Sequence, residues 1–261
     1  MNRGPIVAID GPAGAGKSTV ARHLAQHFGL LNLETGAMYR AFALKALRAD
    51  QDFDDPVALE KLARETEITL EADRAANRVL LDGEDVTERI RDSDVTQGAS
   101  RVSVHPAIRA WLVDLQRAMG RNGGVVMEGR DIGTVVFPDA DVKVFLDASP
   151  KARSQRRYEQ NNTAARDGDA SIPGYEHTAG PRFASSSTDQ AALARALRER
   201  DERDRNRATS PLRPAPDAVV IDSTTLTLDQ VLAQIEDLVR PLFTGEKTAK
   251  AAQTAAQASA K

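Results

Sequence analysis

The segment from Gly11 to Thr19 has the composition of a loop that binds phosphate. Its residues are Gly11, Pro12, Ala13, Gly14, Ala15, Gly16, Lys17, Ser18 and Thr19. Glycines let successive backbone N–H groups turn inward around an anion, and the start of the next helix adds its positive end. We expect Lys17 to reach the β- and γ-phosphates of a nucleoside triphosphate, and the Ser18 hydroxyl to ligate Mg²⁺. The alternative, a glycine-rich turn that matches by accident, is weaker because so many positions are fixed.

Two other segments place an arginine close to the expected end of a strand. In Thr35–Arg40, a hydroxyl, a helix start and an arginine one turn later could contact an anion, although a capped surface helix explains this segment equally well. Glu128, Arg130 and Asp131 follow the apolar run 125–127 at the carboxyl end of a strand, where open parallel sheets bind ligands. Burying three charged groups so close together is costly, so we favour a functional interpretation there.

A third group is the mixed charge run from Arg198 to Arg207. Such runs are usually solvated helices held by ion pairs. However, the segment from Lys151 to Arg213 carries a net charge of +4 in a chain whose net charge is −3. A positive segment of this kind suits a lid that closes arginines over phosphates during phosphoryl transfer, where cations stabilise spread negative charge.

Composition excludes several other kinds of chemistry. The 27 arginines and 8 lysines are outnumbered by 38 acidic residues, which argues against a nucleic-acid or membrane-surface binder. No cysteine is present, so disulfides, thiolate nucleophiles and cysteine-ligated metals are ruled out. His23 and His27 have helical spacing, but we expect them on the solvated side of a helix and predict no zinc site. With no apolar run long enough for a membrane span and no signal-peptide pattern, we expect a cytoplasmic protein.

The elements that position these residues alternate along the chain. Apolar runs at 6–9, 125–127, 142–146 and 218–221, with a weaker one at 30–33, predict strands covered on both faces, as in a parallel sheet. Helices are expected over about 17–28, ended by Gly29, and over about 37–49, with others beginning at Pro56 and after Pro106. The sequence therefore predicts an α/β fold, a three-layer α/β/α core with a five-stranded parallel sheet.

Three segments depart from this alternation. The runs 68–71 and 78–81 predict antiparallel strands in a small inserted lobe. Asn161–Gln190 lacks apolar periodicity, so we expect a long loop or insert there. Residues 245–261 are rich in Ala, Gln and Thr, which predicts a tail that does not pack.

With these residues assembled, the chain resembles the bacterial cytidylate kinases, a family of nucleoside monophosphate kinases. The resemblance spans about residues 5–238 and depends on the loop 9–19, the segment 35–40, the segment 129–140 and the segment 203–207. The last two are far more specific than the phosphate loop. The resemblance implies that the chain transfers the γ-phosphate of ATP to CMP or dCMP with Mg²⁺.

The resemblance also implies roles for individual residues. Residues matching Thr35, Arg40, Arg130 and Arg207 hold the acceptor phosphate in the family, while those matching Ser100, Arg109 and Asp131 read the cytosine edge. Arg200 and Asp204 match residues at the acceptor sugar. The catalytic group implied is Lys17, Arg130, Arg200 and Arg207, with Arg156 and Arg157 as weaker lid candidates. Many members of the family carry Asp at the position of Glu128. Glu keeps the negative charge but reaches further, and this difference affects any role of the residue in binding a metal.

This resemblance suggests a division of the chain. Residues 1–59, 106–155 and 208–244 would form the P-loop core, 60–105 the CMP-binding lobe, 156–207 an arginine-rich lid with a flexible insert, and 245–261 a disordered tail. We expect a monomer that binds ATP and CMP or dCMP, and neither nucleic acid nor membranes. The alternatives are a kinase for UMP or another small metabolite and a non-catalytic P-loop switch, although no switch-type Asp-x-x-Gly element follows the loop.

Overall fold

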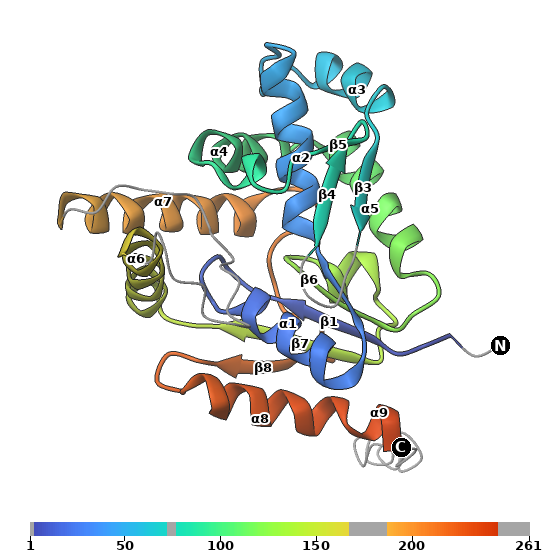
Figure 1. Cartoon of the computed structure of the whole chain (residues 1–261), viewed down its shortest axis with the longest axis vertical. Helices are drawn as coiled ribbons and strands as arrows, with labels where there is room; N and C mark the ends of the chain where they lie inside the picture. Colours follow the sequence, from blue (N-terminus) through green and yellow to red (C-terminus); the bar gives the residue numbers. More distant parts are fainter. Residues whose placement is uncertain (1–2, 72–76, 167–186, 245–261) are drawn as a thin grey trace.

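Five parallel strands form the central sheet of the molecule, in the order β2, β6, β1, β7, β8 (Figure 1). The computed structural model describes residues 3–71, 77–166 and 187–244. The strands are β1 (Ile6–Asp10), β2 (Leu31–Glu34), β6 (Val125–Gly129), β7 (Val142–Asp147) and β8 (Val219–Asp222). All four neighbouring pairs are parallel. The prediction of a five-stranded parallel sheet is therefore confirmed.

The sheet is covered on both faces, which explains why its central strands are continuously apolar. On one face, Val7 and Ile9 of β1 pack with α1 (Lys17–Phe28) and α8 (Leu228–Val239). On the other face, Ile6 and Ala8 pack with α5 (Pro106–Gly120) and a short π-helical turn, η2 (Ile132–Val136). Since neighbouring residues of a strand point to opposite faces, this alternation produces the predicted three layers.

The helix α1 begins at Lys17, within the phosphate-binding segment, because glycines before it let the chain turn tightly. Gly11 has φ 149°, and a Cβ atom there would lie 2.0 Å from the carbonyl oxygen of Leu146. Gly16, with φ 97°, precedes the first helical residue. The helix ends at Phe28, and the left-handed Gly29 donates its backbone N–H to Ala25, as predicted from the sequence.

The segment between α2 (Thr35–Arg48) and α5 forms a lobe with its own sheet. It contains α3 (Pro56–Arg64), the antiparallel strands β3 (Ile68–Glu71), β4 (Arg78–Leu81) and β5 (Glu84–Asp85), the short turn η1 (Arg89–Arg91) and α4 (Ser93–Val102). The two predicted antiparallel strands are confirmed. Phe42 of α2, Val79 of β4 and Ile108 of α5 fall in one hydrophobic cluster, so the lobe is packed onto helices that also reach the central sheet.

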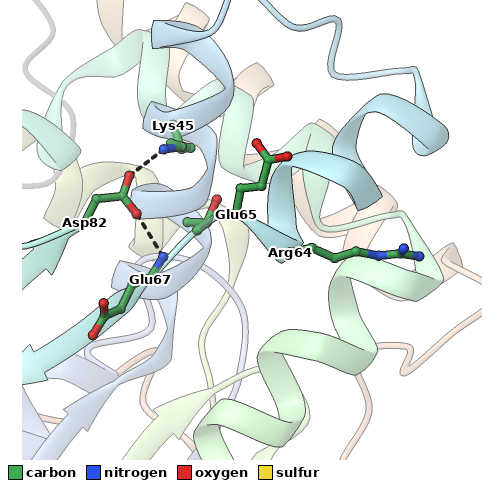
Figure 2. A pocket seen from close by; sticks show the side chains of 6 residues that line it. Lys45, Arg64, Glu65, Glu67 and Asp82 are labelled. Carbon is green, nitrogen blue, oxygen red and sulfur yellow. Dashed lines mark hydrogen bonds and ion pairs between the residues drawn. The ribbon is translucent and has the colours of Figure 1, made fainter.

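Asp82 fixes the β-hairpin of the lobe to α2, as Figure 2 shows. One carboxylate oxygen lies 2.5 Å from Lys45 Nζ, and the other accepts a hydrogen bond of 2.9 Å from the backbone N–H of Glu67. These residues line an open pocket with Arg64, Glu65 and Thr66. Its mixture of opposite charges lies outside the site predicted from the sequence.

Two helices pack against each other beside the carboxyl ends of the strands, α6 (Pro150–Arg166) and α7 (Ser187–Asn206) (Figure 1). The prediction of a loop over Asn161–Gln190 is wrong at both ends, because α6 continues to Arg166 and α7 begins at Ser187. Both helices are rich in polar residues, so they lack the apolar periodicity by which helices are predicted. Residues 167–186, within the same prediction, lie outside the described residues.

The described part of the chain ends in two helices, which lie below the sheet in the view of Figure 1. A capping box between Thr227 and Gln230 starts α8, and α9 (Pro241–Thr244) follows it. The predicted tail, 245–261, lies outside the described residues. In the parts of the chain that the structure describes, no helix combines the length and apolar character needed to cross a membrane.

Candidate active site

A cavity of about 560 Å³ lies at the carboxyl ends of β1 and β6, between the phosphate-binding loop, α2, α4 and α7. Nine residues predicted for the acceptor nucleotide all line it: Thr35, Arg40, Ser100, Arg109, Arg130, Asp131, Arg200, Asp204 and Arg207. Six residues of the predicted donor loop line the same cavity, Ala13, Gly14, Gly16, Lys17, Ser18 and Thr19, whereas Gly11, Pro12 and Ala15 do not line it. The structure thus brings together residues from both predicted binding groups.

Lys17 is the buried cation at the bottom of this cavity. Its ammonium group donates a hydrogen bond of 2.8 Å to the carbonyl oxygen of Pro12, across the loop. Burial, and next the charge of Arg130, lowers the pKa of Lys17 to about 7. An anion bound in the loop would oppose both influences and favour the charged form.

Ser18 and Glu128 form a hydrogen-bonded pair on the wall of the cavity that Lys17 also lines. The Ser18 hydroxyl donates a hydrogen bond of 2.5 Å to Glu128 Oε1. Burial raises the pKa of Glu128, although the charge of Lys17 opposes this effect. A hydroxyl and a carboxylate at this distance suit Mg²⁺, a hard cation that prefers oxygen ligands and usually completes its shell with phosphates and water.

Asp10 is a buried residue of the site that the sequence analysis missed. Its two carboxylate oxygens accept hydrogen bonds of 2.8 Å from the backbone N–H groups of Ile132 and Gly133. Burial raises the pKa of Asp10 to about 7 despite these hydrogen bonds. Asp10 therefore ties the end of β1, where the phosphate-binding loop starts, to the segment that follows Asp131. A polar residue at the end of a buried strand was the available signal.

Arg109 and Asp131 form a buried ion pair at the far side of the cavity. Arg109 Nη2 lies 2.5 Å from Asp131 Oδ2, and their side chains are 2% and 6% exposed. The guanidinium group also lies over the ring of Tyr39, 5.5 Å from its centroid, and donates to the carbonyl oxygen of Ser103. Arg109 Nε has no partner among the described residues. Nearby, Arg203 of α7 donates a hydrogen bond to the Ser100 hydroxyl.

Asp204 of α7 holds two of the predicted phosphate-binding arginines. Its Oδ2 accepts a hydrogen bond of 2.9 Å from Arg130 Nε, and its Oδ1 lies 3.5 Å from Arg207 Nη1. Arg207 Nη2 is buried and has no hydrogen-bond partner within the described part of the chain. The carboxylate therefore orients both guanidinium groups and leaves donor capacity toward the cavity.

Thr35 and Arg40 occupy the start of α2 in different ways. The Thr35 hydroxyl donates a hydrogen bond of 2.8 Å to the carbonyl oxygen of Glu128, which joins α2 to β6. Arg40 Nη2 lies 2.5 Å from Glu34 Oε1. An acceptor phosphate would therefore share Arg40 with Glu34, a neighbour that the sequence analysis did not single out.

Arg157 and Arg200 line the cavity from α6 and α7, and neither guanidinium group has a hydrogen bond or ion pair among the described residues. Burial, with the charge of Arg40 next, lowers the pKa of Arg157 to about 10. Burial and the charge of Arg130 lower the pKa of Arg200 to about 10 as well. By contrast, Arg156 donates hydrogen bonds to the side chain and backbone of Ser223. Arg157 is thus the better placed of the two weaker lid candidates.

Arg153, also missed by the sequence analysis, connects the phosphate-binding loop with α7. Its guanidinium group donates hydrogen bonds of 2.9 Å to the carbonyl oxygens of Ala13 and Ala148. A third contact, of 2.6 Å, reaches Asp201 of α7, and both side chains are buried. No local pattern marks this link, because its members come from three separate segments.

The charges around the cavity are strongly unbalanced. Eleven lysine and arginine side chains line it, against five carboxylates, although the whole chain has a net charge of −3. Low-dielectric walls carrying one sign of charge concentrate oppositely charged ligands. The cavity is therefore built for a ligand that carries several negative charges.

Known proteins are similar to this chain over most of its length. The family model described as Cytidylate kinase matches residues 7–171 and 180–241. The cytidylate kinase of Pelotomaculum thermopropionicum is 50% identical, over 90% of this chain and 96% of its own. The cytidylate kinases of Solibacter usitatus and Aeromonas salmonicida are 46% and 42% identical, covering 92% and 88% of this chain and 94% and 92% of their own. The chain belongs to the cytidylate kinase family.

Proposed function

We propose that the chain transfers the γ-phosphate of ATP to CMP and dCMP, forming CDP and dCDP. The observation that carries this proposal is a single cavity lined both by the phosphate-binding loop and by the buried pair Arg109 and Asp131. Donor and acceptor can meet there without leaving the protein. Membership of the cytidylate kinase family supports the same reaction.

The donor triphosphate would be held by the loop Gly11–Thr19. Its backbone N–H groups and the positive end of α1 bind phosphate oxygens, and Lys17 lies close enough to the loop to reach the terminal phosphates. Mg²⁺ bound by Ser18, with Glu128 beside it, would neutralise charge on the donor phosphates.

The acceptor phosphate would lie between Thr35, Arg40, Arg130 and Arg207. The side chain of Asp204 restrains Arg130 and Arg207, so little side-chain entropy is lost when they bind the phosphate. Arg200 and Asp204 would lie at the acceptor sugar.

Asp131 and Arg109 would select the base, with Ser100 beside them. A carboxylate accepts a hydrogen bond from the amino group of cytosine, and a guanidinium donates to its ring nitrogen and carbonyl. Uracil presents a carbonyl oxygen in place of the amino group, so it would face Asp131 with like partial charge. Leaving these buried groups unpaired is costly, which is the physical basis of selection.

The transfer itself would be direct and in line. An oxygen of the acceptor phosphate attacks the γ-phosphorus, the bond to the β-phosphate oxygen breaks, and that oxygen leaves with ADP. Lys17, Arg130, Arg200 and Arg207 would stabilise the negative charge spread over the transferred group. Arg157 would add a further positive charge, since it lines the same cavity without a carboxylate partner among the described residues.

The remaining proposals concern the molecule as a whole. We propose that residues 60–105 bind the monophosphate, that 156–207 act as a lid, and that the enzyme works as a cytoplasmic monomer on free nucleotides. Packing of α6 on α7, and the contribution of α7 to the cavity wall, support the role of the lid.

A coupled assay of ADP release tests the proposed reaction. MgATP is supplied with CMP, dCMP, UMP, AMP or shikimate, and with no acceptor as the control. We expect the fastest release with CMP and dCMP. Equal rates with CMP and AMP, or no stimulation by CMP over the control, would contradict the proposed reaction.

A further inference from the structure

We propose a second metal site, for a borderline divalent cation such as Zn²⁺, on the surface between α1 and α8. Its ligands would be His23 and His27 of α1 and Glu236 of α8. This site is separate from the cavity described above, since none of its residues lines that cavity. From the sequence we expected the two histidines on a solvated face and predicted no zinc site. The carboxylate beside them, Glu236, is 213 residues from His23 in the chain and was not visible in the local pattern.

The geometry brings three suitable ligand atoms together. One ligand atom from each of the three residues lies within 4.8 Å of the other two. His23 Nε2 and Glu236 Oε1 are 2.6 Å apart, and the rings of His23 and His27 are nearly parallel, with centroids 5.8 Å apart. Two histidines four residues apart on one helix face are a recurrent zinc-binding arrangement.

Closure around an ion requires only small side-chain movements. Ligand atoms around a tetrahedral zinc lie roughly 3.3 Å apart, given bonds of about 2.0–2.1 Å. Separations of up to 4.8 Å would shorten by rotation of the exposed His27 side chain, whose ring also contacts the rings of His23 and Phe28. The hydrogen bond between His23 and Glu236 would be replaced by two metal bonds, and water would complete the fourth position.

The helices that supply the ligands are firmly held. Leu24 of α1 and Ile235 of α8, the residues beside His23 and Glu236, are buried in one hydrophobic cluster. Preorganised ligands lose less entropy on binding than ligands on mobile loops. A metal here would fasten the end of α1 to the last long helix of the fold.

One neighbouring cation opposes metal binding. Arg240 Nη2 lies 3.6 Å from Glu236 Oε2, on the opposite carboxylate oxygen from His23. Because the ion pair uses Oε2, Oε1 of Glu236 can still bind a metal, but the Arg240 guanidinium group places a positive charge close to the metal position. Arg240→Ala should therefore bind Zn²⁺ more tightly than the parent chain.

Calorimetric titration of the untagged full chain with Zn²⁺ tests the site. Excess Mg²⁺ is included to occupy the oxygen ligands of the phosphate cavity. We expect one equivalent of Zn²⁺ to bind and to raise the melting temperature. His27→Ala and Glu236→Gln should each weaken binding by about tenfold or more, because even outer-shell partners are worth that much. Gln26→Ala, an exposed neighbour on α1, is the matched control and should bind as the parent does.

Two results would overturn the proposal. One is the absence of Zn²⁺ binding by the parent chain in excess Mg²⁺. The other is equal binding by His27→Ala and the parent, since the ion would then be held elsewhere. His27 is exposed, so its substitution leaves the fold intact, and both results can be interpreted.

Discussion

The cavity that holds Lys17 lowers the affinity of its amine for a proton, and a bound anion would raise that affinity again. Burial and Arg130 lower its pKa to about 7, and Asp10, whose pKa burial raises to about 7, lies near it. Negative charge from a triphosphate stabilises the protonated form of both groups. Binding of the donor should therefore be coupled to proton uptake.

This coupling predicts a pH-dependent calorimetric signal. At pH 8, both groups are largely deprotonated in the free enzyme, so MgATP binding without acceptor should take up protons. At pH 6, both are largely protonated already, and the uptake should nearly vanish. Titrations in two buffers of different ionisation enthalpy measure the proton number. Lys17→Arg, which stays charged, should reduce the uptake at pH 8, and an identical proton number at both pH values would contradict the assignment.

Asp131→Asn tests the selection of the base. The amide can present its NH₂ group to uracil as a donor, and it removes the charge that opposes the uracil carbonyl. We expect the ratio of kcat/KM for CMP to that for UMP to fall by about tenfold or more. This ratio does not depend on the fraction of folded enzyme. The control is Asp114→Asn, on the exposed face of α5, which should leave the ratio unchanged. If the ratio is also unchanged in Asp131→Asn, Asp131 does not select the base.

The link between Arg153 and Asp201 shows how elements are coupled. It joins the phosphate-binding loop, the end of β7 and α7 through one buried guanidinium group. Removing one partner of a buried ion pair leaves the other charge buried without a partner, which lowers the free energy of unfolding by about 3–5 kcal/mol. We place Arg153 among the residues that position the loop, because it donates a hydrogen bond to the loop carbonyl of Ala13.

A double-mutant cycle measures this link. Arg153→Met should lower the free energy of unfolding by about 3 kcal/mol, because the Asp201 carboxylate stays buried without its partner. In the double variant Arg153→Met/Asp201→Asn, the loss of unfolding free energy should be smaller than the sum of the losses in the two single variants. Urea denaturation gives the values, with Arg205→Met as an exposed control on α7. Additive losses would show that the two residues are not energetically coupled.

Sequence patterns predicted the elements that depend on neighbouring residues. The limits of α1, its glycine cap and the five strands follow from local periodicity and turn residues. The phosphate loop and the residues around Arg130 were found for the same reason. By contrast, the ends of α6 and α7 were missed because those helices are polar and pack on each other.

Contacts between distant segments could not be predicted in this way. The hydrogen bonds of Asp10 span 122 and 123 residues, and the contact of His23 with Glu236 spans 213. Such pairs depend on the order of strands in the sheet and on which face each helix covers. The resemblance to a family named residues that we propose to act on the nucleotide, but it did not reveal these connections between elements.

At the scale of the whole molecule, a chain with a net charge of −3 concentrates eleven cationic side chains on one cavity. The central sheet places the phosphate-binding loop at the end of β1. The end of β6 and α5 place Asp131 and Arg109, the pair proposed to read the base, on the wall of the same cavity. Neither half would catalyse transfer alone, since rate enhancement depends on holding both phosphates in line.

A competition reaction between CMP and UMP tests whether the enzyme transfers phosphate selectively to the cytosine nucleotide. Equal concentrations of CMP and UMP are incubated with limiting MgATP in one vessel, and the diphosphate products are separated by chromatography. The product ratio equals the ratio of kcat/KM values, so enzyme concentration and folded fraction cancel. We predict that CDP greatly exceeds UDP, with one ADP formed for each diphosphate. Equal amounts of CDP and UDP would rule out selection of cytosine. ADP formed without any pyrimidine nucleoside diphosphate would rule out transfer of the phosphate to CMP.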